Sequence, residues 1–305
     1  MFANLVVTNY DRRMKHKPVD SAIKNSLDKS LIDLESYFNS DILSFYGPIN
    51  IGSESVILNL IEDLKSDVNS KERLSVILTT PGGSAETVER YVNILRHHYN
   101  EVDFIVPDYA YSAGTIFCMS GDRIFMDYFS VLGPIDPQVQ NKEGRFVGAL
   151  GYLDKIEELI LKAKNDTLTQ AEFIILKDFD LAELKGYEQA KELTIDLLKR
   201  WLVKYKFKNW DTHESNPDKI GKPVTDAEKE ERAKSIADIL SDNNKWKSHG
   251  RPISLQRLQD ELRLKIEDYS DDETMRHPIR TYQDMLTDYV GKNGYPNFLH
   301  TRRFF

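Results

Sequence analysis

Hydrophobic positions between residues 41 and 126 follow two alternating spacings. Short apolar runs have the length and the β-branched content of buried strands, and they cover residues 42–46, 74–78, 102–106 and 123–126. The segments between them place apolar residues at helical spacing, and they cover residues 53–67, 84–95 and 112–120. Strands that alternate with helices of this length predict βαβ units and a mostly parallel sheet.

The pattern changes beyond about residue 150, where helical spacing dominates. Helices are predicted over residues 156–164, 182–206, 226–240 and 254–267, and Thr225 and Glu228 form a capping box for the third. The chain therefore divides into a charged N-terminal arm (1–30), an α/β core (31–180) and a mostly helical C-terminal extension (181–305). We expect this extension to oligomerise the protein or to cover the site.

Composition and charge narrow the class of protein. Hydrophobic residues make up 40% of the 305 residues, which is enough for a packed core, and a net charge of −8 argues against nucleic acid as a partner. The single cysteine, Cys118, excludes an intramolecular disulfide and a cysteine-rich zinc site. A spanning helix needs about 18 consecutive apolar residues, and no window reaches that length. We therefore predict a cytoplasmic protein with no membrane span.

Two of three short motifs suggest chemistry at the ends of the predicted strands. In Pro81-Gly82-Gly83 the glycines let the backbone turn with its amides facing outward, where they can bind an oxyanion. Ser112 opens a helix whose N-terminus stabilises negative charge, and the small residues Ala113 and Gly114 leave room for a substrate carbonyl. The alternatives are an ordinary strand-to-helix turn for the first motif and a serine N-cap for the second.

The third motif, Leu132-Gly133-Pro134-Ile135-Asp136-Pro137-Gln138, predicts a rigid loop. Its two Gly-Pro and Asp-Pro steps restrict the backbone, and structural rigidity alone explains them. Site-loop residues are expected from all three motifs. They are Pro81, Gly82, Gly114, Gly133, Pro134 and Asp136.

Taken in this order, the motifs resemble the serine dehydrogenase proteinase family of Clp/crotonase-fold serine peptidases. That family is related to signal peptide peptidase A and to the Clp protease proteolytic subunit. A later segment, Ser248-His249-Gly250-Arg251-Pro252-Ile253, also resembles its His-x-x-Pro-Ile element. The resemblance implies an α/β fold, with a Clp/crotonase-type βαβ spiral core and a helical C-terminal extension.

The resemblance also implies an activity. Ser112 would be the nucleophile that cleaves a peptide or protein substrate, and the amides of Gly83 and Ala113 would form the oxyanion hole. Members of this fold form rings or stacked multimers, so we expect a homo-oligomer.

The general base is the open question. In the Clp subunit it is a histidine about 25 residues after the serine, whereas this chain has no histidine between His98 and His213. Lys155, 43 residues after Ser112, has a spacing that resembles the Ser-Lys dyads of stomatin-associated proteinases, and it is the first candidate. Its other interpretation is a surface lysine paired with Glu158 at i+3. His249 is the alternative base.

Two other functions remain possible on the sequence. One is a catalytically degenerate scaffold or regulatory protein, and the other is a crotonase-type acyl-CoA enzyme, for which Asp136 is the one carboxylate near the site loops. The chain has no HExxH, CxxC or Walker motif, so no metal or cofactor is predicted. We expect an ATPase or another adaptor partner to unfold any folded substrate.

Overall fold

A mostly parallel six-stranded sheet forms the centre of the computed structural model, which describes residues 18–140, 146–213 and 218–305. Its strand order is β10-β5-β3-β2-β1-β11, and every neighbouring pair is parallel except β1 with β11. The strands are β1 (Asp41–Tyr46), β2 (Arg73–Thr79), β3 (Glu101–Val106), β5 (Arg123–Met126), β10 (Glu267–Asp268) and β11 (Phe298–His300). The predicted parallel sheet is confirmed.

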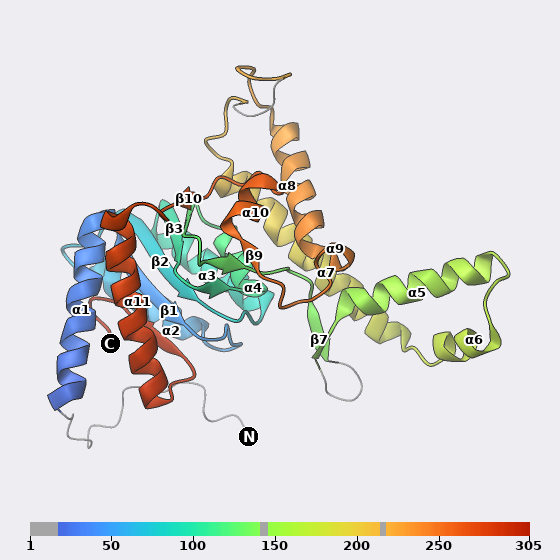
Figure 1. Ribbon diagram of the computed structural model, residues 1–305, viewed down its shortest axis with the longest axis horizontal. Coiled ribbons are helices and arrows are strands. Elements are labelled where there is room, and N and C mark those ends of the chain that lie inside the picture. The colour runs from blue at the N-terminus through green and yellow to red at the C-terminus, as the bar shows by residue number, and fades with distance from the viewer. Residues whose placement is uncertain (1–17, 141–145, 214–217) are drawn as a thin grey trace.

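Helices cover both faces of this sheet, so its strands are buried from two sides. On one face lie α2 (Glu54–Ser66), α3 (Ala85–His98), α4 (Ala113–Cys118), α7 (Leu181–Trp201) and α8 (Asp226–Ser241). On the other face, α1 (Pro18–Phe38) and α11 (Glu273–Asn293) lie side by side (Figure 1). Successive residues of a strand point to opposite faces of the sheet. Val76 packs in the hydrophobic cluster under α2 and α3, and Ile77 packs in the cluster under α1 and α11.

A small second sheet lies against the carboxyl ends of the main strands. It consists of β4 (Tyr109–Ala110), β6 (Val131–Leu132) and β9 (Ile253–Ser254), in the order β4-β6-β9. The pairing of β6 with β9 joins the core to a segment more than a hundred residues later. A hairpin of β7 (Gln138–Gln140) and β8 (Phe146–Gly148) then leads into the helical part of the chain.

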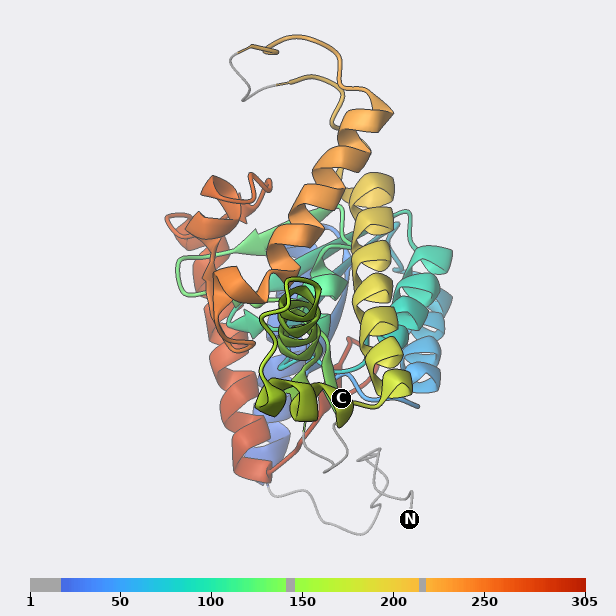
Figure 2. The same ribbon diagram turned by 90° about the vertical axis from the view of Figure 1, so that its right-hand side faces the viewer.

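The helical part begins as an arm that extends away from the sheet (Figures 1 and 2). The arm contains α5 (Ala149–Lys164) and α6 (Gln170–Lys177), and α7 returns to the core and continues as a π-helical segment, η1 (Leu202–Lys206). The short helices α9 (Asn243–Trp246) and α10 (Leu255–Asp260) follow α8. The predicted capping box of Thr225 and Glu228 at the start of α8 is confirmed.

The helix predicted over residues 254–267 is confirmed only in its first part and is wrong beyond Asp260. Helix α10 ends at Asp260, and the chain reaches the sheet edge as β10. Leu262, Leu264 and Ile266 are buried while the residues between them are exposed, which is the two-residue alternation of extended chain.

The division into arm, core and extension stays a prediction. Residues 1–17 of the predicted arm lie outside the described residues, and residues 18–30 belong to α1. Residues 267–268 and 298–300 of the predicted extension add the strands β10 and β11 to the two edges of the main sheet. The last part of the chain therefore packs as part of the core.

An arginine near the end of the chain joins three elements of this core. Arg302 Nη1 donates to Glu35 Oε1 of α1 at 2.8 Å and to Asp41 Oδ1 of β1 at 2.7 Å, and its Nε reaches Asp67 Oδ2 at 3.3 Å. Asp41 is fully buried, and burial raises the pKa of Glu35 even beside the guanidinium. The guanidinium therefore compensates charges that have no access to water.

We expect Arg302→Met to lower the free energy of unfolding by about 3–5 kcal/mol, because it leaves buried carboxylates without a counter-charge. Since protonation neutralises those carboxylates, the loss should shrink as the pH falls. Arg303→Met is the matched control, because Arg303 pairs with Asp63 at the surface and should contribute less than about 1 kcal/mol. Urea unfolding measures both variants, and equal losses would contradict the interpretation.

Candidate active site

The Gly-Gly turn lies where β2 ends, between Ile49 and the segment that carries Ser112. Ile49 N donates to Gly82 O at 2.8 Å, and Ser84 N donates to Ile49 O at 3.1 Å. These two bonds flank Gly83, so its own N–H faces away from Ile49. On the opposite side of the β2 extension, Thr80 pairs with Ala110. The amide of Gly83 is therefore directed to the side on which the segment leading to Ser112 runs.

Both glycines of the turn are required by geometry. Gly82 has φ +104° and Gly83 has φ +151°, in the region that side chains rarely adopt. A Cβ on Gly83 would overlap the carbonyl oxygen of Ile49, and a Cβ on Gly82 would lie 2.8 Å from Ser112 Cβ. The turn thus packs directly against Ser112, with no space for any side chain between them.

Ser112 has a backbone conformation that is unusual for a serine. Its φ of 52° and ψ of −119° are strained for any residue with a Cβ, and such strain is concentrated at functional sites. Ser112 stands at the predicted N-cap position of α4, but its hydroxyl makes no capping hydrogen bond to the helix. The side chain is half-buried, and among the described residues its hydroxyl has no hydrogen-bond partner. Ser112 is therefore oriented for a role other than capping.

Two amides beside Ser112 have no partner within the described part of the chain. These are Gly83 N–H and Ala113 N–H, while the neighbouring Gly114 N donates to Tyr111 O at 2.8 Å. Ala113 is buried, and an unpaired buried N–H is unfavourable unless something occupies it, whereas Gly83 is exposed and its N–H can bind water. Two such amides beside a serine can stabilise the oxyanion of acyl transfer, which is the role that the resemblance implies for them.

Close packing behind Ser112 holds the site loop in place. Gly114 lies against Thr80, and Gly133 lies against the ring of Tyr111, so a Cβ on either glycine would overlap a neighbour. Thr115 Oγ1 lies 2.8 Å from Ala110 O and 2.9 Å from Gly133 O, and it accepts from Gly133 N at 3.0 Å. Thr115, which the sequence analysis did not select, therefore links α4 to both of the segments around it.

The structure brings together two residues that are 113 positions apart. His249 Nδ1 lies 2.7 Å from Asp136 Oδ1, and the Asp136 side chain is only 5% exposed while that of His249 is 29% exposed. Strands β6 and β9 explain the contact, because they pair antiparallel with Leu132 opposite Ile253. The turn that precedes β9 and the loop that follows β6 then bring His249 and Asp136 together.

The loop that carries Asp136 runs beside the segment that carries Ser112, although no hydrogen bond joins His249 or Asp136 to Ser112 among the described residues. Ala110 pairs with Leu132 in the parallel β4–β6 ladder, and the contact of Gly133 with Tyr111 continues that register. Because a carboxylate accepts at Nδ1, the neutral imidazole of His249 carries its proton on Nδ1 and leaves Nε2 as the proton acceptor. A carboxylate in this position holds the histidine ring in one orientation.

Lys155 lies on the exposed arm. Its Nζ pairs with Glu158 Oε2 at 2.9 Å, and its side chain is 51% exposed. The pair with Glu158 that the i+3 spacing predicts is confirmed. No bond joins Lys155 to Ser112 among the residues that the structure describes, and a catalytic role for this lysine stays a prediction.

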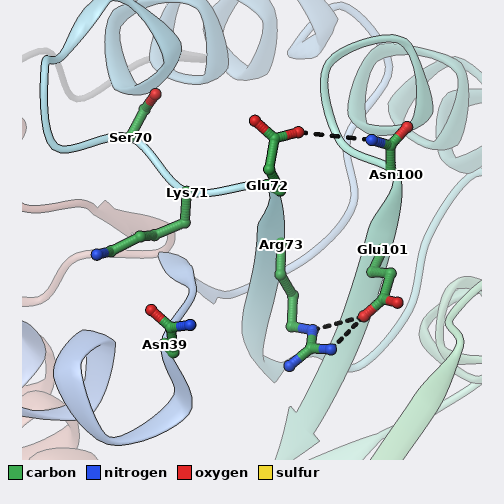
Figure 3. A pocket seen from close by; sticks show the side chains of 7 residues that line it. All are labelled: Asn39, Ser70, Lys71, Glu72, Arg73, Asn100 and Glu101. Atoms are coloured by element: carbon green, nitrogen blue, oxygen red, sulfur yellow. Dashed lines mark hydrogen bonds and ion pairs between the residues drawn. The ribbon is translucent and has the colours of Figure 1, made fainter.

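Two cavities lie at the opposite edge of the sheet, where the parallel strands begin. One has a volume of about 570 Å³ and is lined by polar side chains at the starts of β2 and β3 (Figure 3). The other contains Lys206 of η1, and burial lowers the pKa of this lysine to about 8. Both cavities are separated from Ser112 by the length of the strands.

The described residues offer no group of three or more histidine, cysteine or acidic side chains arranged to hold a metal ion. None of the helices in the described ranges is long and apolar enough to cross a lipid bilayer.

Comparison with known proteins gives a family match. The model of the family described as ClpP-like SDH-type serine proteinase matches residues 43–215, more than half of the chain. It confirms the resemblance and the ClpP-like α/β class. Among solved structures, a mutant of the 1510-N membrane-bound stomatin-specific protease is 13% identical, with a TM-score of 0.43, over 76% of this chain and 80% of that chain. The ClpP protease catalytic domain from Plasmodium falciparum is 15% identical, with a TM-score of 0.31, over 57% and 90%.

Two relatives come from Methanocaldococcus jannaschii, and both are uncharacterized proteins. MJ0137 is 29% identical over 255 residues, which are 83% of this chain and 71% of the relative. MJ1495 is 28% identical over 224 residues, which are 73% of this chain and 61% of the relative. The chain therefore spans less than two thirds of the length of MJ1495.

Proposed function

Because this chain belongs to the ClpP-like SDH-type serine proteinases, we propose that it hydrolyses peptide bonds through an acyl-enzyme on Ser112. One observation carries the proposal. Ser112 has a strained backbone and a hydroxyl that caps nothing, its neighbour Ala113 has an unpaired amide, and the Gly82-Gly83 turn with the unpaired amide of Gly83 packs against it.

In the proposed reaction, Ser112 Oγ attacks the carbonyl carbon of the scissile peptide. The carbonyl oxygen becomes an oxyanion, and the N–H groups of Gly83 and Ala113 donate to it. The base that accepted the serine proton then gives it to the leaving amine, so that the C–N bond breaks and an ester remains on Ser112. Water hydrolyses that ester by the same steps in reverse order.

For the general base we propose His249, oriented by Asp136, in preference to Lys155. The bond of 2.7 Å between His249 Nδ1 and the buried Asp136 carboxylate supports this choice, because it leaves Nε2 ready to accept a proton. A lysine base needs burial to lose its proton, whereas Lys155 is half exposed and paired with Glu158. The bond to His249 also occupies the one carboxylate that an acyl-CoA enzyme could use at this loop.

The test is hydrolysis of an unfolded protein, such as reduced and alkylated casein, by the purified full chain. We expect cleavage without added metal or nucleotide, and we expect a stably folded substrate to remain intact unless an unfolding ATPase partner is supplied. Absence of casein cleavage at every oligomeric state of the protein would favour a scaffold with a degenerate site.

We also propose that the protein is a homo-oligomer assembled through the α5–α6 arm. The arm and the start of α7 expose large apolar side chains, namely Ile160, Leu161, Phe173, Ile174, Ile175 and Leu181. Contiguous exposed apolar side chains of this kind mark protein–protein contacts. A second copy of this chain is the partner that the family resemblance implies.

We expect Leu161→Glu combined with Ile174→Glu to reduce the mass of the particle in light scattering to that of one chain. Burying a charge in an apolar contact without a partner is strongly unfavourable, so assembly should be lost while the fold is kept. Val68→Glu is the control, because Val68 is exposed away from the arm at the end of α2. An unchanged mass in the double variant would mean that the arm is not the contact.

A further inference from the structure

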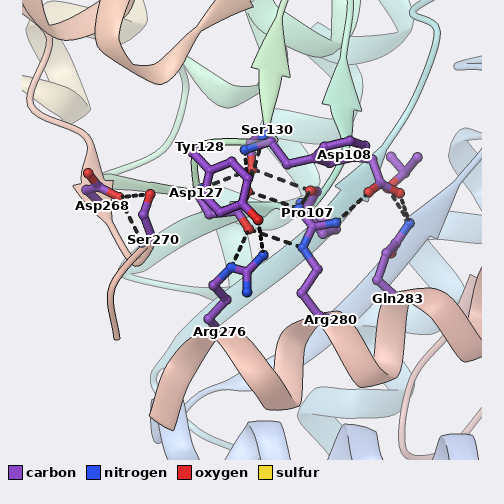
Figure 4. Close-up of polar contacts among 12 residues, drawn as sticks. Pro107, Asp108, Asp127, Tyr128, Ser130, Asp268, Ser270, Arg276, Arg280 and Gln283 are labelled. Atoms are coloured by element: carbon purple, nitrogen blue, oxygen red, sulfur yellow. Dashed lines mark hydrogen bonds and ion pairs between the residues drawn. The ribbon is translucent and has the colours of Figure 1, made fainter. Parts of the chain in front are cut away.

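One stripe of helix α11 faces the carboxyl ends of the parallel strands. Arg276, Arg280 and Gln283 follow each other at helical spacing, and their side chains point at the segments that leave β2, β3 and β5 (Figure 4). The Gly-Gly turn and the segment leading to Ser112 begin at this same edge. The stripe is thus in direct contact with the bases of the two segments that carry the candidate site.

Arg280 binds the segment after β3 and the segment after β5. Its Nη1 donates to Asp108 Oδ1 at 2.8 Å, and its Nε and Nη2 donate to the two oxygens of Asp127 at 3.1 and 2.9 Å. The guanidinium also donates to the carbonyl oxygen of Pro107. Asp127 is fully buried, and hydrogen bonds and charge from Arg280 hold its pKa below the ordinary value against the opposing effect of burial.

Gln283 links the two segments that matter for the site. Its Nε2 donates to Asp108 Oδ2 at 2.6 Å and to Thr79 Oγ1 at 3.0 Å, so one amide group joins the end of β2 to the segment after β3. Gln283 is fully buried, and its Oε1 has no hydrogen-bond partner within the described residues. The carboxylate of Asp108 fixes this orientation, because a rotated amide would place two oxygens against each other.

Each of the two residues that Gln283 links lies four positions before a residue of the candidate site. Thr79 lies four residues before Gly83, and Asp108 lies four residues before Ser112. The backbone pairing of Thr80 with Ala110 continues from this link toward the site. The link through Gln283 therefore sets the separation between the segment that leads to Gly83 and the segment that leads to Ser112.

We propose that Gln283 is a positioning residue, which holds the amides of Gly83 and Ala113 at the separation that an oxyanion needs. It acts through Thr79 and Asp108, and Arg280 holds Asp108 from its other oxygen. The inference rests on the proposed function only for its catalytic consequence. Its structural content, the control of the two site segments by α11, can be measured in the absence of any activity.

The test uses two variants and a matched control in the full chain. Gln283→Met keeps the length of the side chain and removes the donor, and Gln283→Glu places a carboxylate beside Asp108. Asp284→Asn changes the exposed neighbour on the same helix and should leave the site as it is. The readout is the rate at which a fluorophosphonate probe labels Ser112, with thermal unfolding followed in parallel.

We expect Gln283→Met to label about 10-fold to 100-fold more slowly than wild type at every pH, because small misplacements of a reacting geometry have effects of this size. Gln283→Glu should be slowest at high pH, where two carboxylates repel. Its rate relative to wild type should rise as the pH falls, because one proton shared between the carboxylates restores the bond. The charged groups that face this position are Asp108, Asp127, Arg276 and Arg280.

Labelling of Gln283→Met at the wild-type rate would overturn the proposal while leaving a peptidase on Ser112 intact. Backbone hydrogen exchange tests the proposal in two further cases. In one the probe does not label the wild type, and in the other the variant is less stable than the wild type. We expect faster exchange confined to residues 80–84 and 109–114 in the variants. Exchange that rises uniformly over the whole sheet would assign Gln283 a general structural role and overturn the proposal.

Discussion

Replacing Ser112 with alanine is expected to lower the rate of casein hydrolysis by about 10⁶-fold, the effect of removing a nucleophile that works as a unit with its base. The oxyanion hole would remain, because the amides of Gly83 and Ala113 belong to the backbone. Residual activity of a few per cent would contradict the assignment, since it would require another nucleophile. Hydrolysis measured by peptide release with and without the substitution gives the result.

A second substitution at the same position separates catalysis from folding. Ser112→Gly should be equally inactive, but its free energy of unfolding should exceed that of Ser112→Ala by about 1 kcal/mol, because glycine adopts a φ of 52° without strain. Urea unfolding of the two inactive variants measures the difference. A less stable glycine variant would mean that Ser112 is not strained, and it would remove one support of its proposed role.

Removing the base is expected to have the next largest effect. His249→Ala and Asp136→Asn should each lower the rate of hydrolysis by about 10⁴-fold or more, the size seen when the orienting carboxylate of a serine-peptidase site is lost. Added imidazole should restore part of the activity of His249→Ala only, because that variant leaves an opening beside the retained carboxylate. Lys155→Met is the matched control and should keep its activity within a few-fold of wild type.

The opposite pattern has a clear meaning as well. An inactive Lys155→Met enzyme together with an active His249→Ala enzyme would restore the Ser-Lys dyad. It would also mean that the arm moves so that Lys155 leaves Glu158 and reaches Ser112. Loss of activity in Lys155→Met with a change of particle mass would instead indicate a defect of assembly, so the mass is measured on the same samples.

The core of the fold was predictable because the four central strands are rich in apolar residues and are separated by turn residues and amphipathic helices. The runs at 74–78 and 102–106 lie within β2 and β3, and Ser84 caps α3 as its position before the apolar stripe suggests. Ser112, Gly83 and Ala113 were selected from local sequence and by resemblance, and they lie together at one edge of the sheet. Each motif alone also fitted an ordinary turn or cap, so it was the resemblance that selected these residues, and their catalytic roles stay predictions.

The rest of the site depends on contacts between distant segments. The β6–β9 pairing has only two residues on each side, too few for a period-two pattern, yet it brings the segment that carries His249 to the loop that carries Asp136. Gln283 lies on a helix whose polar stripe resembles a solvated face in sequence, although it is buried against strand ends. The side chain of Lys155 pairs with Glu158, as the i+3 spacing predicts, and its catalytic role stays a prediction.

The central claim is that Ser112 is an activated nucleophile, and covalent labelling tests it most directly. The wild-type chain is treated with a fluorophosphonate probe and digested, and the modified peptide is identified by mass spectrometry. We predict one adduct, on Ser112, which persists in Lys155→Met and is lost in His249→Ala. A wild type that carries no adduct in any of its assembled forms, or that carries it on another residue, would contradict the account.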